Sequence, residues 1–254
     1  MSKKVKIIIG SIVGLAVLAF AAVFIYVKVI KDDAPKAFDE SSLDSVLGAT
    51  TTTSPGDPTT VPGATTASST AASTATTAAA SASGATTTDG TWNVASDSVL
   101  GYRVKETLAG LDTEGAGRTS SITGTMTIAG TAVSAVDLTV DMTTFKSDDS
   151  RRDGQFNGNI MDVAKYPTAT FALTSPVDLG GIPSDGSSVT VKAIGDLTMH
   201  GATQSVTFDL TAKETSGRIG VVGSTVITFA DYGIDNPSNG FATTGDSGTL
   251  ELQL

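Results

Sequence analysis

The sequence contains no cysteine, which excludes disulfide bonds, a thiol nucleophile and an N-terminal cysteine that could carry a lipid. It contains a single histidine, His200, so a metal site would have to be built from carboxylates. Asp148 and Asp149 have no third acidic residue at the spacing of a metal-binding loop. His200 lies in Met199-His200-Gly201, which is typical of a hairpin turn. We therefore expect no metal ion, no cofactor and no catalytic residues.

Basic residues are also scarce. The chain has 16 Lys and Arg residues against 26 Asp and Glu residues, a formal net charge of −10. This balance argues against nucleic acid as a partner, because phosphate binding needs a basic stripe. It also argues against flat docking on anionic lipid headgroups.

Charge is absent from residues 7–27, a run of 21 residues that is long enough to cross a bilayer core. Lys3, Lys4 and Lys6 precede it, which favours a cytoplasmic N-terminus. The sequence therefore predicts a transmembrane signal-anchor helix in residues 1–31, with the rest of the chain extracytoplasmic at the cell membrane. A cleaved signal peptide is the alternative, since Ala19-Phe20-Ala21 resembles a cleavage site, but the apolar run continues to Val27.

Residues 32–90 are predicted to be a disordered linker. From Ala49 to Thr88 the chain is almost wholly Thr, Ala, Ser, Gly and Pro, which cannot bury enough apolar surface to offset the entropy of ordering. A flexible coil of about 60 residues spans roughly 45 Å, so we expect it to hold the globular part away from the membrane. An O-glycosylated stalk is the alternative. The stretch Phe38–Leu47 has a weak helical pattern, and we favour disorder for it.

Residues 91–254 show the period-two pattern of β-strands. Val136, Leu138, Val140 and Met142 alternate with polar residues, and a second apolar series runs through Val206, Phe208, Leu210 and Ala212. Turn residues separate such runs. The pattern predicts an all-β fold, an antiparallel barrel or sandwich of about eight strands. A charged turn from Ser147 to Asp153, followed by a short irregular or helical connector, leads to a strand from Thr168.

The side chains predicted to face inward are mostly small and aliphatic. Aromatic residues make up only 6% of the chain, which is low for a barrel packed solid. A barrel of eight strands either fills itself or encloses one ligand, and the residues alone leave both open. If a lumen exists, we expect its wall to include Val136, Leu138, Val140, Phe171, Val191, Ala193, Phe208 and Phe229.

The run Arg151-Arg152-Asp153 directly follows a strand, where a barrel rim would lie. Arg151 or Arg152 at such a rim could clamp a phosphate or carboxylate headgroup through paired hydrogen bonds. The alternative is structural, with Arg–Asp pairs that fasten the connector across the end of the barrel.

Six segments, in order, resemble the YceI-like family of exported proteins. They are Trp92–Val94, Ser98–Val104, Ser147–Asp153, Met161–Phe171, Gly195–Thr203 and Ile227–Ile234. The resemblance implies a lipocalin-like antiparallel barrel with an apolar lumen for a polyisoprenoid or other long lipid. The chain departs from the family pattern at Lys105-Glu106, where a histidine is common, and at Gln155–Asn159.

Our hypothesis is a membrane-anchored, extracytoplasmic carrier or buffer that holds a long-chain lipid or isoprenoid in the barrel lumen without covalent chemistry. A homodimer is possible. The first alternative is a structural or interaction module of the cell envelope with a solid barrel core. The second is an enzyme, which would require Arg151, Asp153, Asp231 or His200 to converge in a cleft.

Overall fold

The computed structural model describes residues 15, 17–24, 34–48, 88–181, 186–238 and 242–254. Within these ranges the chain forms thirteen strands. The strands are β1 (Gly90–Asn93), β2 (Val99–Leu108), β3 (Leu111–Thr119), β4 (Ile122–Ala129), β5 (Ala132–Asp141), β6 (Lys146–Ser147), β7 (Thr168–Leu173), β8 (Val177–Asp178), β9 (Ser188–Met199), β10 (Ala202–Thr215), β11 (Arg218–Thr228), β12 (Ala242–Thr244) and β13 (Ser247–Gln253). The helices and helical turns after residue 33 are α2 (Glu40–Leu47), η2 (Met142–Thr144), α3 (Ser150–Gln155), η3 (Phe156–Ile160) and η4 (Phe229–Tyr232). Residues 15 and 17–24 are also helical.

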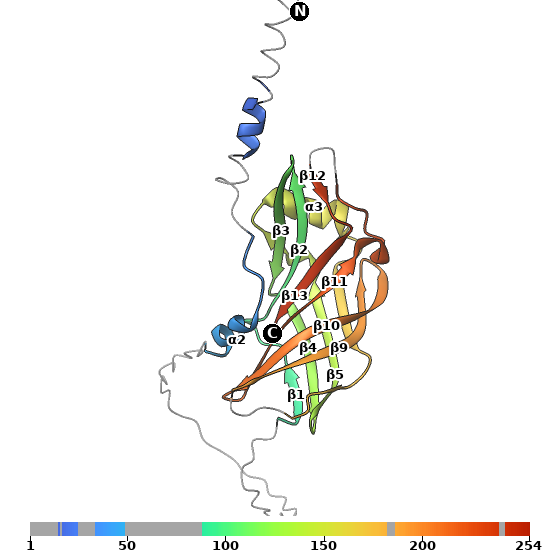
Figure 1. Cartoon of the computed structure of the whole chain (residues 1–254). Coiled ribbons are helices and arrows are strands. Elements are labelled where there is room, and N and C mark those ends of the chain that lie inside the picture. The colour runs from blue at the N-terminus through green and yellow to red at the C-terminus, as the bar shows by residue number, and fades with distance from the viewer. Residues whose placement is uncertain (1–14, 16, 25–33, 49–87, 182–185, 239–241) are drawn as a thin grey trace, which may run out of the picture. The chain divides into compact units, whose positions relative to one another are not determined.

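All the paired strands are antiparallel and belong to one sheet, in the order β1-β4-β5-β7-β9-β10-β11-β13-β2-β3-β6. The sheet is curled (Figure 1). Strand β8 pairs with β5, and β12 pairs with β2. The predicted all-β antiparallel fold is confirmed, but the predicted number of about eight strands is wrong. Strands β1, β6, β8 and β12 contain between two and four residues, too few to show an alternating pattern in the sequence.

The sheet is curled rather than fully closed, which corrects the expectation of a closed barrel. In the described residues, β3 and β4 follow each other along the chain but pair with β6 and β1 instead of with each other. Both end strands of the order are short, so they cover the edges of their neighbours only in part. Short edge strands are a common way to protect a sheet from pairing with other chains.

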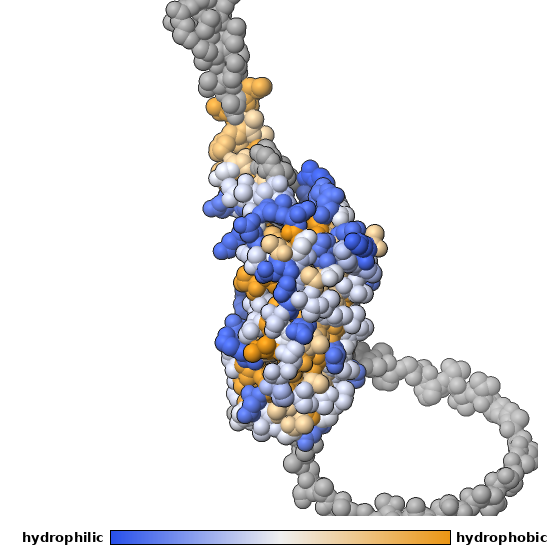
Figure 2. Space-filling model, turned by 90° about the vertical axis from the view of Figure 1, so that its right-hand side faces the viewer, coloured by the Kyte–Doolittle hydropathy of each residue, from blue (hydrophilic) through white to orange (hydrophobic). Residues whose placement is uncertain are grey.

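Strand β5 explains how the alternating pattern makes one apolar wall. Val136 and Val140 point inward, while Asp137 and Thr139 are exposed. The pairing with β4 skips Ser134, so this β-bulge also lets Val133 point inward. Outward positions are mostly polar, and the face in Figure 2 shows hydrophilic and neutral residues with small hydrophobic areas between them.

The predicted connector between Ser147 and the strand at Thr168 is confirmed. It consists of α3 followed by the wider turn η3. The carboxylate of Asp149 accepts a hydrogen bond of 2.8 Å from the backbone N–H of Arg151, which caps the start of α3. The Ser147 hydroxyl donates to the Asp149 carbonyl at 2.9 Å and to Asp153 at 2.7 Å. The charged turn therefore holds the connector in place.

The N-terminal regions differ from the prediction in one respect. Residues 34–48, expected to be part of the disordered linker, carry helix α2, whose Leu43 is fully buried and whose Val46 is 9% exposed. An eight-residue helix is marginal in isolation, so its packing against β10 and β11 accounts for it. Residues 49–87, the rest of the low-complexity stretch, lie outside the described residues.

No helix in the described part of the chain is both long and apolar enough to span a bilayer. Much of the predicted span, residues 7–14, 16 and 25–27, lies outside the described residues.

Candidate ligand-binding cavity

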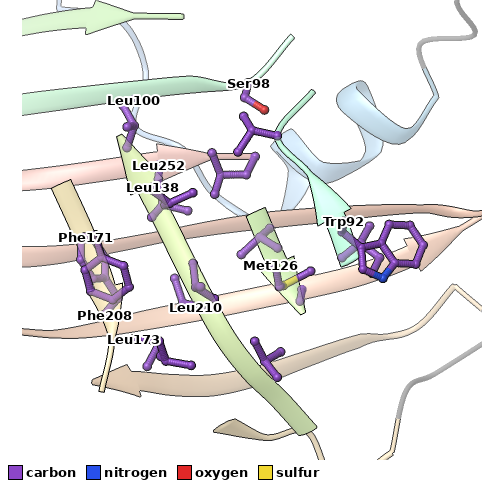
Figure 3. A pocket seen from close by; sticks show the side chains of 18 of the residues that line it. Trp92, Ser98, Leu100, Met126, Leu138, Phe171, Leu173, Phe208, Leu210 and Leu252 are labelled. Atoms are coloured by element: carbon purple, nitrogen blue, oxygen red, sulfur yellow. The ribbon is translucent and has the colours of Figure 1, made fainter. Parts of the chain in front are cut away.

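The curled sheet encloses a cavity of about 250 Å³ whose wall is almost entirely apolar (Figure 3). Strands β1, β2, β4, β5, β7, β8, β9, β10, β11 and β13 all contribute to this wall. Seven of the residues predicted from the sequence line it: Val136, Leu138, Val140, Phe171, Val191, Ala193 and Phe208.

Phe229, the eighth apolar residue predicted for the lumen, does not line the cavity. It is 8% exposed and packs in a core cluster at the end of the barrel near α3, η3 and η4. Aromatic rings fill this end: Tyr102 stacks on Phe156 with centroids 4.9 Å apart, and Phe145 lies 5.2 Å from Phe156. We call this end of the barrel, where Tyr102, Phe156 and Phe229 pack together, the filled end. Alternation along a strand predicts which face a residue lies on, but not whether it lies at the filled or the hollow part.

Arg151 and Arg152, predicted to contact a headgroup, do not line the cavity. Arg151 is largely exposed and pairs with Asp149 at 3.0 Å. Arg152 binds Glu106 of β2 at 3.2 Å and also pairs with Asp148. Burial opposes the charge of Arg152, but Glu106 and Asp148 raise its pKa above the ordinary value. The Arg152–Glu106 pair ties α3 to β2, whereas the two Arg–Asp pairs lie within the charged turn and α3.

Glycines keep large side chains against the cavity wall. A Cβ atom at Gly195 would lie 2.3 Å from Cζ of Phe171, so that ring covers the place where a side chain would begin. Leu138 covers Gly124 in the same way, and Leu210 covers Gly223. Phe171 also meets Phe208 edge to face, with centroids 5.5 Å apart. The large residues therefore line the lumen without plugging it.

The wall contains a polar residue that the sequence reasoning did not select. Ser98 is 2% exposed, and its hydroxyl is buried with no hydrogen-bond partner among the described residues. It immediately precedes β2 and lines the cavity near Leu252 (Figure 3). A buried hydroxyl without a partner costs about 1–3 kcal/mol, so a polar ligand atom at this point would be favoured. Pattern analysis does not select such a residue for the cavity, because a serine at the end of a strand is predicted to belong to a turn.

Two charged residues are found in the described part of the lining, and both have partners. Lys213 binds Asp44 of α2 at 2.8 Å, and the carboxylate of Glu214 accepts a hydrogen bond of 2.8 Å from the backbone N–H of Gly217. Among the described residues, the wall therefore offers no arginine and no cluster of cations to a ligand.

Asp153 and His200, two of the residues considered for catalysis, have structural partners. Asp153 accepts hydrogen bonds from Ser147, and Nδ1 of His200 lies 2.9 Å from the Tyr232 carbonyl oxygen in the β9–β10 turn. Burial raises the pKa of the Tyr232 phenol to about 12, so this group stays neutral. In the part of the chain that the structure covers, no three His, Cys, Asp or Glu side chains form a group that could hold a metal ion.

A strongly curled antiparallel sheet around one apolar cavity defines a lipocalin-like binding fold. The chain belongs to the YceI-like family, since the YceI-like domain matches residues 59–254. The family resemblance seen in the sequence is therefore confirmed.

Curated relatives and a solved structure are also similar to the chain. The chain is 34% identical over 113 residues to a UPF0312 protein of Vibrio vulnificus, which covers 41% of this chain and 54% of the relative. It is 33% identical over 126 residues to a UPF0312 protein of Pseudomonas putida, 46% of this chain and 59% of the relative. The chain thus spans little more than half the length of these curated relatives. A polyisoprenoid binding domain from Saccharophagus degradans implicated in plant cell wall breakdown matches 64% of this chain and 95% of its own, with a TM-score of 0.52 and 20% identity. At that identity the likeness shows the fold.

Proposed function

We propose that the protein binds a long apolar lipid of the polyisoprenoid type in its cavity, as a carrier or buffer without covalent chemistry. The observation that carries this proposal is the apolar cavity of about 250 Å³, which seven residues predicted from the sequence line. The solved relative described as a polyisoprenoid binding domain supports the same ligand class.

The size of the cavity bears on how such a lipid would bind. Pockets for drug-sized ligands commonly measure about 300–1,000 Å³, so this cavity takes a segment of a long chain rather than the whole of it. The rest of the lipid would extend out of the cavity, or would enter it as the curled sheet adjusts. Burial gains about 0.8 kcal/mol per CH₂ relative to water, but a lipid in a bilayer has already gained this. Exchange with a membrane would therefore be nearly thermoneutral, as a carrier requires.

The polar end of the ligand is proposed to be uncharged. Arg151 and Arg152, the predicted headgroup contacts, are held by carboxylates at the filled end. Of the buried side-chain polar atoms without a hydrogen-bond partner among the described residues, the Ser98 hydroxyl is the one that belongs to the cavity wall. An alcohol, ketone or amide would complement it, whereas a diphosphate would lose its hydration without gaining a cation.

We further propose that the protein is anchored in the cell membrane by residues 1–31, with the barrel extracytoplasmic. The uncharged run of 21 residues from 7 to 27 supports this arrangement. An anchor would raise the local concentration of the cavity near its lipid source.

Blocking the cavity tests the proposed function. We expect Val191→Trp, which places an indole in the lumen, to reduce uptake of a fluorescent prenyl alcohol at least tenfold while the fold is kept. Val226→Trp is the matched control, because Val226 is 67% exposed on the outside of β11. Fluorescence titration measures uptake, and circular dichroism checks the fold. Equal uptake by Val191→Trp and the unaltered protein would show that the ligand does not occupy this cavity.

A further inference from the structure

Residues 34–48, which we call the strap, lie outside the YceI-like match and contact the outer surface of the barrel. The first part of the strap, residues 34–39, has no regular secondary structure. Arg103 of β2 donates a hydrogen bond to the Pro35 carbonyl, and Arg118 of β3 donates one to the Lys36 carbonyl. The backbone N–H of Phe38 lies 3.4 Å from the carboxylate of Glu251 in β13. Three strands of the barrel therefore hold one short stretch of main chain.

The barrel surface beneath this stretch is a nearly buried ion cluster. Glu251 is 2% exposed and binds Arg103 at 2.8 Å and Arg118 at 3.2 Å. Burial opposes the charge of Arg103, but its hydrogen bond to Glu251 raises its pKa above the ordinary value. Buried charges need every hydrogen-bonding position satisfied, and carbonyl groups of the strap supply part of that requirement. The guanidinium of Arg118 also lies 4.1 Å from the centre of the Phe38 ring, a cation–π contact.

The second part of the strap is helix α2, and the barrel has space for it. A Cβ atom at Gly220 would lie 3.1 Å from Cδ2 of Leu43 and 3.3 Å from Cγ of Leu47, so the absence of a side chain there admits the helix. Polar pairs flank this contact: Lys213 binds Asp44 at 2.8 Å, and Arg218 donates to the Val46 carbonyl at 3.1 Å.

We propose that this surface is an intramolecular docking site whose occupant is the strap, and that the strap, rather than the long low-complexity stretch, joins the barrel to the N-terminal run. Only residues 28–33 separate the uncharged run from the strap. Six residues span at most roughly 20 Å. Residues 49–87 connect the end of the strap to the start of β1, two points on the same barrel, so they do not set the distance between barrel and anchor. The short distance between the barrel and the membrane rests on the proposed anchoring of residues 1–31, whereas the docking of the strap on the barrel does not.

Cleavage within residues 49–87 of the full-length protein tests this proposal. A protease site is inserted after residue 66, the protein carries an N-terminal affinity tag, and the cut protein is captured through that tag in detergent. We expect most of the barrel fragment to stay with the N-terminal fragment after the cut. If the barrel fragment is lost after cleavage of the protein with the natural strap sequence, the proposal is overturned. A second protein with the site after residue 30 should release the strap and the barrel together.

Substitutions in the strap identify the surface. Leu43→Asp puts a carboxylate in the fully buried position of α2 and should release the barrel fragment after cleavage. Ser45→Asp changes an exposed position of the same helix and should retain it. Retention by Leu43→Asp would show that α2 is not docked on β11. Uptake of the prenyl alcohol, measured on the same uncut proteins, separates the two proposals: retention of the barrel without uptake would contradict the lipid function alone.

Discussion

At the scale of single residues, the space inside the barrel comes from glycines as well as from small aliphatic side chains. Gly124, Gly195 and Gly223 each lie beneath a large residue of a neighbouring strand. Alternation predicted which residues face inward, and seven of the eight apolar choices line the cavity. Alternation did not predict the cavity, because a glycine in a strand indicates only that another group packs closely against the backbone. The glycine does not identify which side chain packs there.

A methyl group at position 195 should partly close the cavity. Its carbon would lie 2.3 Å from Cζ of Phe171 and 2.6 Å from the Ala172 carbonyl oxygen, so both the ring and the backbone of β7 must shift. We expect Gly195→Ala to lower the free energy of unfolding by about 1–3 kcal/mol and to reduce uptake of the prenyl alcohol. Denaturant titration and fluorescence titration measure the two effects. Gly154→Ala, where a Cβ atom meets nothing within 4 Å, is the control. Unchanged stability and uptake in Gly195→Ala would refute this account of the wall.

Removal of the Ser98 hydroxyl should separate stability from binding. Because the hydroxyl is buried without a partner among the described residues, Ser98→Ala should leave the ligand-free protein as stable as before or more stable. The same change should weaken binding of a prenyl alcohol about two- to tenfold, the worth of one hydrogen bond, and leave binding of a hydrocarbon of equal length unchanged. Thermal unfolding and paired titrations measure these effects. An equal loss for both ligands would mean that Ser98 does not contact the polar end.

At the scale of elements, the two ends of the barrel differ in how they are filled. The connector formed by α3 and η3 brings Phe156 against Tyr102, and burial raises the pKa of that tyrosine above its usual range. The sequence predicted the connector because charged turn residues and a Tyr-Pro pair mark its ends. It did not predict the four shortest strands or α2, since elements this short depend on what they pack against.

The arginines of α3 offer a direct comparison between the headgroup and structural interpretations. Arg152→Ala leaves Glu106 and Asp148 without their shared partner and should lower the free energy of unfolding by about 1–3 kcal/mol. Arg151→Ala removes a surface pair and should cost less than about 1 kcal/mol. Neither change should alter the affinity for the prenyl alcohol. Chemical denaturation and fluorescence titration test both variants, and loss of binding in a folded Arg152→Ala protein would restore the headgroup interpretation.

At the scale of the whole molecule, composition divides the chain into an uncharged run, a low-complexity stretch and a β domain. The sequence placed the strap in the linker, although it packs on the β domain. Its weak helical pattern does not show that the barrel surface around Glu251 and Gly220 can bind it. If the anchoring proposal holds, the barrel works close to the membrane surface. Its acidic character, together with the formal net charge of −10, would keep it from adhering to anionic headgroups while it exchanges lipid.

The central claim is that the barrel holds a lipid in its apolar cavity, and native mass spectrometry of the full-length protein purified in mild detergent tests it most directly. We predict a bound species with the mass of one long-chain neutral lipid, which organic extraction removes and added prenyl alcohol replaces. The same species should be absent from Val191→Trp and present in Val226→Trp. A protein that carries no lipid when purified, and that takes up no prenyl alcohol when it is supplied, would contradict the account.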